Sequence, residues 1–284
     1  MSEPTPYHCA CGHLVFFRNS ACLNCKHALG YDPDQDTMLR LKPSRDGIQW
    51  FANTNAGSRV AFRRCANLET AAACNWLIAA TPANAGLKWC LSCRLSRTIP
   101  NLSSHANAER WRRIEFAKRR LVASLLRLKL PVHPRAEGNP NTGLAFDFIE
   151  PDPNTGSVIT GHFDGVITLN IEEAEAPVRE AIRTRMRERY RTILGHLRHE
   201  TGHYYWELLV RDAEKTEQFR LLFGAETINY DAALHHYYQY GPPAGWEQNF
   251  ISAYATAHPW EDWAECWAHY LHMVDTLETA IRYG

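Results

Sequence analysis

The sequence predicts an α+β protein with a cysteine-rich N-terminal region followed by a mainly helical region that carries a small antiparallel sheet. Eight of the nine cysteines lie before residue 94. Runs rich in β-branched and aromatic residues occur in the middle of the chain, and most of the C-terminal half repeats its apolar residues every three or four positions. With 284 residues, the chain has room for one substantial core and a smaller module. We therefore expect two domains, at residues 1–98 and 104–284.

Each element is indicated by its local pattern. A boundary near 96–104 is rich in Pro, Asn and Ser, and it leads into an amphipathic helix that ends at Pro131. Strand-like runs occupy 143–150 and 156–171, with a turn at 152–156 between them. A long helix is expected from Pro177 to residue 212, because its apolar residues keep the helical period. Shorter helices are expected at 214–222, 247–257 and 260–281.

The charge balance and the N-terminus set limits on location and partners. Lys plus Arg and Asp plus Glu both number 31, so overall charge favours neither nucleic acid nor a membrane surface. The first residues lack a basic segment followed by an apolar one, and nowhere do eighteen apolar residues run together. We expect a cytoplasmic protein without a signal peptide or membrane span.

Reducing compartments keep thiols free to bind metal, so the cysteines favour zinc over disulfides. Cys9-x-Cys11 and Cys22-x-x-Cys25 supply four thiolates within seventeen residues, which suits one structural zinc ion. Four later thiolates are candidates for a second structural zinc, although the first two lie too far apart to form a tight knuckle. These are Cys65, Cys74, Cys90 and Cys93.

Residues 199–203 read His-Glu-Thr-Gly-His. On a helix, His199 and His203 lie one turn apart on the same face and can reach one ion, while Glu200 suits a general base that takes a proton from water whose pKa zinc lowers. Chance is the alternative, but the motif lies in the strongest helical pattern and comes after a strand-rich segment. If residues 165–171 form an edge strand, an extended peptide could add to it; a purely structural strand is equally compatible.

The third zinc ligand is expected in residues 258–273, which read HPWEDWAECWAHYLHM. Glu261 is the predicted ligand, and another carboxylate of this helix can orient a ligand. A solvated helix face is the alternative, but interleaved tryptophans favour a helix that is buried or lines a cleft. His258 and His269 are the reserve ligands if Glu261 fails.

Together, RTILGHLRHETGHYYWELL and SAYATAHPWEDWAECWAHYLHMVDTLETA resemble the bacterial family of zinc-binding metallopeptidases that carry an N-terminal zinc-ribbon domain. The resemblance covers nearly the whole chain, and it implies a zincin-like peptidase domain after the zinc-ribbon region. Members of that family are known mainly as predicted peptidases, so the resemblance does not identify a substrate.

A more distant resemblance is to the lethal-factor type of gluzincin, in which a Tyr precedes a Glu-x-x-Ala-Glu helix. Tyr254 stands seven positions before Glu261, and Glu-Asp-Trp-Ala-Glu occupies 261–265. By that resemblance Glu261 is the third zinc ligand, Glu265 is a carboxylate that orients a ligand, and Tyr254 stabilises the oxyanion. A packed aromatic residue is the alternative for Tyr254.

These patterns favour a zinc-dependent peptidase acting on a peptide or protein substrate. The alternative is an adaptor that binds nucleic acid or protein through the ribbon region and the basic stretch 110–129, with a peptidase-like domain that only binds. A solvated helix face explains that stretch better, because the net charge of the chain is zero.

Overall fold

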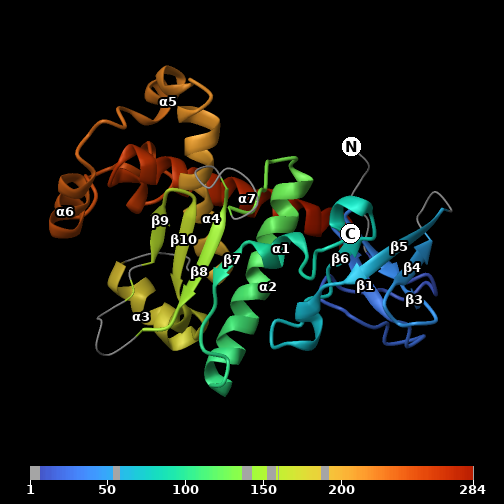
Figure 1. Ribbon diagram of the computed structural model, residues 1–284. Coiled ribbons are helices and arrows are strands. Elements are labelled where there is room, and N and C mark those ends of the chain that lie inside the picture. The colour runs from blue at the N-terminus through green and yellow to red at the C-terminus, as the bar shows by residue number, and fades with distance from the viewer. Residues whose placement is uncertain are drawn as a thin grey trace.

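Short strands and turns make up the cysteine-rich N-terminal region (Figure 1). In the computed structural model, residues 7–53, 58–135, 143–151, 158, 160–186 and 192–283 are described. Strands β1 (Leu29–Asp32) and β2 (Thr37–Arg40) form an antiparallel pair. A second antiparallel sheet has the order β3-β4-β5-β6, with strands at Lys42–Pro43, Trp50–Asn53, Arg59–Arg64 and Leu77–Ala79. The predicted α+β class, with a zinc-ribbon region before a mostly helical one, is confirmed.

The second region contains a four-stranded sheet of order β7-β8-β10-β9. Its strands are Ser96–Thr98, Ala145–Ile149, Val166–Asn170 and Gly161–Phe163, in that order. Only β9 and β10 are antiparallel; they are joined at Asp164 and Gly165, which both have positive φ. In the sequence, β9 lies between β8 and β10 and runs in the direction opposite to both, so β8 and β10 are parallel. Strands β7 and β8 are also parallel. The expected antiparallel pairing therefore holds for the hairpin only.

The segment predicted as a boundary contributes β7 to this sheet, where Ser96 pairs with Phe146. The helix α2 (His105–Arg127) starts directly afterwards, with the Ser104 side chain accepting a hydrogen bond from the Asn107 amide. Its inner face carries a fully buried ion pair, in which the Lys118 ammonium lies 2.7 Å from the Glu115 carboxylate. The Ser96 hydroxyl also donates to Glu115, at 2.6 Å. Strand β7 is thus tied to both the sheet and the helix.

Within the described residues, the α-helices that come after the sheet are α3 (Ala176–Met186), α4 (Ile193–Trp206), α5 (Thr216–Phe223), α6 (Tyr230–Tyr240) and α7 (Pro259–Tyr283). The single helix expected from Pro177 to residue 212 is wrong at Thr192. That residue has extended backbone, and its side chain caps the start of α4. The helix expected at 247–257 is also wrong, because only two single 3-10 turns form there. The turn predicted at 152–156 lies outside the described residues.

The C-terminal half of α7 returns to the N-terminal region (Figure 1). Its Arg282 and the Arg127 of α2 bind the Asp36 carboxylate at 3.0 and 2.8 Å. The hydroxyls of Tyr7 and Tyr31 donate to the same carboxylate at 2.8 and 2.9 Å. Asp36 therefore joins the N-terminal region to both long helices. None of the helices in the described part of the chain is long and apolar enough to span a membrane.

Candidate metal centre

The site forms where α4 and α7 pack against each other. A Cβ added to Gly202 of α4 would lie 2.9 Å from the Ala264 Cα and 3.3 Å from the Trp267 Cβ of α7. Only glycine permits this approach, and the contact brings the two histidines of α4 opposite Glu261 of α7. In addition, the Trp263 indole donates to the Gly202 carbonyl at 2.8 Å.

Side-chain atoms of His199, His203 and Glu261 converge as a ligand set. All three donor atoms lie within 4.8 Å of one another. The Nε2 atoms of His199 and His203 lie 3.0 and 3.7 Å from the Glu261 carboxylate oxygens. Ligands of tetrahedral zinc at about 2.0–2.1 Å from the ion stand about 3.3 Å apart, so these separations fit one ion. The predicted ligands are therefore brought together.

Charge at the site also fits a divalent cation. Glu261 is 1% exposed, and Glu200 is 6% exposed. Burial would raise the pKa of Glu261, but the histidine charges and the hydrogen bonds to His199 and Tyr230 lower it to about 2. A carboxylate that stays ionised while buried is costly unless a cation or hydrogen bonds offset its charge.

Two further side chains orient the ligand set. Glu265 accepts from Nδ1 of His199 at 2.8 Å, which leaves Nε2 directed toward Glu261. Tyr230, at the start of α6, donates its hydroxyl hydrogen to the Glu261 carboxylate at 2.6 Å. Glu265 was predicted here from the sequence, whereas Tyr230 was not. Tyr230 lies thirty-one residues from Glu261, and only the aromatic-rich stretch after it gave a signal.

Glu200 is hydrogen-bonded by a histidine that does not belong to the ligand set. His196 Nε2 lies 3.1 Å from the Glu200 carboxylate, and His196 Nδ1 lies 2.9 Å from Glu173. Thr160 in turn donates to Glu173 at 2.7 Å. Burial alone would lower the pKa of His196, but the two carboxylates outweigh it and raise that pKa to about 9. A histidine thus holds the candidate general base, with its own orientation fixed by Glu173.

Tyr254 and His162 complete the surroundings of the ligand histidines. The Tyr254 ring, in a 3-10 turn before α7, lies 5.9 Å from the His199 ring. His162 of β9 stacks on His203 at 6.2 Å, so the edge strand beside the site is β9. Residues 165–171, for which the sequence allowed an edge strand, instead contain β10 in the interior of the sheet. Burial and the nearby His203 lower the pKa of His162 to about 4, and it is neutral at pH 7.

The reserve histidines are not part of the ligand set. His258 is 2% exposed, and both of its ring nitrogens are engaged, by the Ile228 carbonyl and the Trp260 amide. His269 Nδ1 bonds the Glu265 carbonyl at 2.8 Å. Burial and the neighbouring Asp262 raise the pKa of Cys266 to about 12, which keeps this side chain in its thiol form at neutral pH.

A family model described as "Putative zinc-binding metallo-peptidase" matches residues 107–284, and a zinc-ribbon domain model matches residues 6–104. The chain belongs to this metallopeptidase family. Uncharacterised proteins of Mycobacterium bovis and Mycobacterium tuberculosis are 41% identical to it over 280 residues, which is 98% of this chain and 76% of each relative. No solved structure matches the chain.

The zinc-ribbon part of the chain contains two groups of four thiols. Cys9 lies 3.6 Å from Cys25, and Cys11 lies 3.7 Å from Cys22, measured between sulfur atoms. With Zn–S bonds of about 2.3 Å, thiolates of a tetrahedral site stand about 3.8 Å apart. The second group converges equally closely and is fully buried: Cys65, Cys74, Cys90 and Cys93. Its wide sequence spacing is closed by the fold, since β6 and α1 (Leu91–Arg94) bring its members together.

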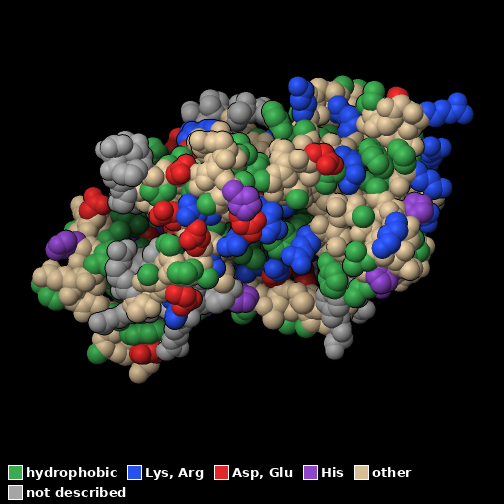
Figure 2. Space-filling model, turned by 90° about the horizontal axis from the view of Figure 1, so that it is seen from below, with side chains coloured by type: hydrophobic (Ala, Val, Ile, Leu, Met, Phe, Trp, Pro, Cys, Tyr) green, Lys and Arg blue, Asp and Glu red, His purple; other side chains and the backbone are tan. Residues whose placement is uncertain are grey.

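Most of the basic residues in the stretch 110–129 form ion pairs with carboxylates of the same chain. Arg112 and Arg113 bind Glu109, Arg110 binds Glu175, and Arg120 binds Asp275. Arg119 is 4% exposed. On the face shown in Figure 2, Lys and Arg gather toward the middle and the N-terminal region, whereas Asp and Glu are more frequent over the other half. The stretch therefore ties parts of the chain together, and most of its positive charge is paired with carboxylates.

Proposed function

We propose that the chain is a zinc-dependent peptidase of the HExxH, gluzincin type, which hydrolyses bonds in a peptide or protein substrate. The convergence of His199, His203 and Glu261 on one point, with Glu200 between the two histidines on α4, carries this proposal. In the same proposal, the two groups of four thiolates hold structural zinc ions, since a closed set leaves no position for water.

Zinc held by this ligand set would polarise the scissile carbonyl and lower the pKa of the attacking water. Glu200 takes the proton of that water and passes it to the leaving amine, while His196 keeps the Glu200 carboxylate in place. Glu265 and Tyr230 fix the orientation of the ligands through the hydrogen bonds described above. The Tyr254 hydroxyl is assigned to the oxyanion of the tetrahedral intermediate.

A Glu200→Gln variant tests the chemical role. It should keep its zinc and lose about 10²- to 10⁴-fold in kcat on a peptide library, with cleavage followed by mass spectrometry. Glu217→Gln is the matched control, because the Glu217 side chain is 86% exposed on α5. Unchanged turnover in Glu200→Gln would remove the mechanism.

Metal content tests the ligand set separately. Elemental mass spectrometry should give about three zinc ions per chain, and about two in a His199→Ala/His203→Ala variant. The same count in both proteins would show that the HExxH segment holds no zinc as purified, and would favour the adaptor alternative or another catalytic metal.

Nucleic-acid binding through the ribbon region remains a separate prediction. Because arginines of α2 are already bound in ion pairs, the basic stretch is a poor surface for binding nucleic acid. Absence of binding to single- or double-stranded nucleic acid at low salt would eliminate it.

A further inference from the structure

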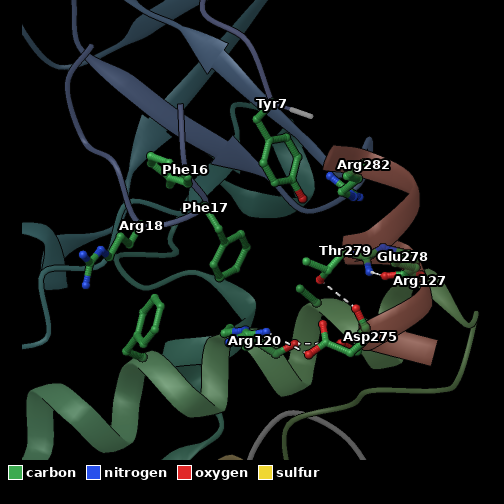
Figure 3. Close-up of a pocket in the computed structure, with 13 residues that line it drawn as sticks. Tyr7, Phe16, Phe17, Arg18, Arg120, Arg127, Asp275, Glu278, Thr279 and Arg282 are labelled. Atoms are coloured by element: carbon green, nitrogen blue, oxygen red, sulfur yellow. Dashed lines mark hydrogen bonds and ion pairs between the residues drawn. The ribbon is translucent and has the colours of Figure 1, made fainter. Parts of the chain in front are cut away.

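A pocket of about 420 Å³ lies between the N-terminal region and the helices α2 and α7 (Figure 3). None of the metal-centre residues lines it. One wall comes from the loop that carries Phe16, Phe17 and Arg18, and the other from α2 with Phe116 and Arg120. Its volume is in the range of sites that hold small organic ligands.

Three phenylalanines, which come from the two opposite walls, form the main apolar surface of the pocket. Phe17 is anchored by edge contacts with Tyr31 at 4.7 Å and Trp76 at 6.4 Å, between ring centroids. Phe16 is 54% exposed, although it is a large apolar side chain. Such a residue at the mouth of a pocket offers a surface for an apolar group.

Positive charge exceeds negative charge in this pocket. Arg127 and Arg282 are held by Asp36. Arg120 donates one bond to Asp275 at 2.8 Å, but the buried Arg198 shares that carboxylate at 3.0 Å. The Arg120 side chain is 42% exposed and has further N–H groups to offer.

Arg18 is the second available cation. It is exposed at the mouth of the pocket, and no described residue forms a hydrogen bond or ion pair with it. In Figure 3 it lies at the end of the pocket remote from Arg282. An anion is therefore the complementary ligand, and the phenylalanines require that it be apolar elsewhere.

We propose that this pocket binds a small monocarboxylic acid with an aromatic or branched aliphatic body. Its carboxylate is attracted by the positive charge of Arg18 and Arg120, and its body lies against Phe16, Phe17 and Phe116. A singly charged group suits the site better than a phosphate, because Asp275 and Glu278 line the same pocket and would repel a second negative charge.

Calorimetric titration of the full-length zinc-loaded protein with 3-phenylpropionate tests the proposal. We expect a Kd of about 1 mM, and at least tenfold weaker binding of 3-phenylpropionamide, which has no charge. Arg18→Gln and Phe16→Ser should each weaken binding of the acid about tenfold. Both residues are exposed, so neither change should disturb folding. Lys129→Gln, which changes an exposed cation just beyond α2, is the control and should leave binding unchanged.

The proposal is independent of the metal centre, and the His199→Ala/His203→Ala variant should bind the acid as the unmodified protein does. Equal binding of acid and amide, or binding insensitive to both Arg18→Gln and Phe16→Ser, would overturn it. Tighter binding of phenyl phosphate than of 3-phenylpropionate would reject the carboxylate. Tighter binding of N-acetyl-Gly-Gly-Phe would reject a small acid in favour of a chain terminus.

Discussion

His196 lies between Glu173 and Glu200 and contacts both through its two ring nitrogens. Each carboxylate is nearly inaccessible to solvent, and this ring supplies a hydrogen bond to both. A buried carboxylate that loses its donor moves or takes up a proton. The orientation of the candidate general base is therefore set three residues before the HExxH motif begins.

Replacing His196 by Ala should lower kcat about 10- to 100-fold and leave KM and zinc content unchanged, because the ligands are untouched. His196→Gln, which retains one donor, should recover part of that loss. His235→Ala is the control, since His235 is exposed on α6. Loss of zinc together with activity would indicate a structural role instead.

For single residues, the sequence predicts those contacts that local helix geometry determines. His199 and His203 share a helix face by spacing alone, so their proximity is implied directly by the motif. Predicting Glu261 as the third ligand required a second helix and its pattern of carboxylates among tryptophans. Tyr230 and Glu173 reach the site from other segments through single hydrogen bonds, and no periodicity marks such contacts.

The helices α4 and α7 meet at Gly202, within the HExxH motif itself. The spacing between them there is set by the absence of a side chain. Any Cβ must push α7 outward, and Glu261 lies on the same helix less than one turn before Ala264. Helix packing and ligand geometry are therefore coupled at this point.

Gly202→Ala should cost about 1–3 kcal/mol in the free energy of unfolding through overpacking, and should also weaken zinc binding. Urea denaturation of the zinc-loaded protein, with a chelator titration for affinity, measures both. Gly86→Ala is the matched control, because a Cβ there meets no atom within 4 Å. Unchanged zinc affinity in a destabilised Gly202→Ala variant would separate packing from the ligand geometry.

Periodicity predicts elements well where one face is continuously apolar, as in α2 and α7. It failed at Thr192, since a capping side chain and extended backbone interrupt a pattern that continues on both sides. It also missed α6, which has no buried residue and so lacks an apolar stripe. The parallel pairing of β8 with β10 depends on chain path, which alternation of residues does not encode.

Asp36 links the two regions of the molecule. Burial would raise the pKa of this carboxyl, but hydrogen bonds from Arg127, Tyr7 and Tyr31 outweigh burial and lower it. A lowered folded-state pKa means that ionised Asp36 stabilises the folded protein above its unfolded-state pKa, near 4, and that this stability is lost as pH falls through the lower value.

Asp36→Asn should reduce the free energy of unfolding by about 2 kcal/mol at pH 7, because it weakens two ion pairs at once. The difference from the unmodified protein should shrink toward zero in acid below pH 4. Chemical denaturation across pH provides the measurement, and Asp34→Asn, on an exposed neighbour, is the control. A difference that persists in acid would show that the charge of Asp36 is not the cause.

The position of strand β7 limits where recombination can divide a chain of this kind. It belongs by sequence to the segment before the peptidase helices, yet it pairs with β8 and places Ser96 against a buried ion pair. Recombination that exchanged the ribbon for another module near residue 100 would remove a strand and leave an open sheet edge. The two parts are therefore expected to pass through evolution as one unit, and insertions should be tolerated in exposed loops sooner than at this junction.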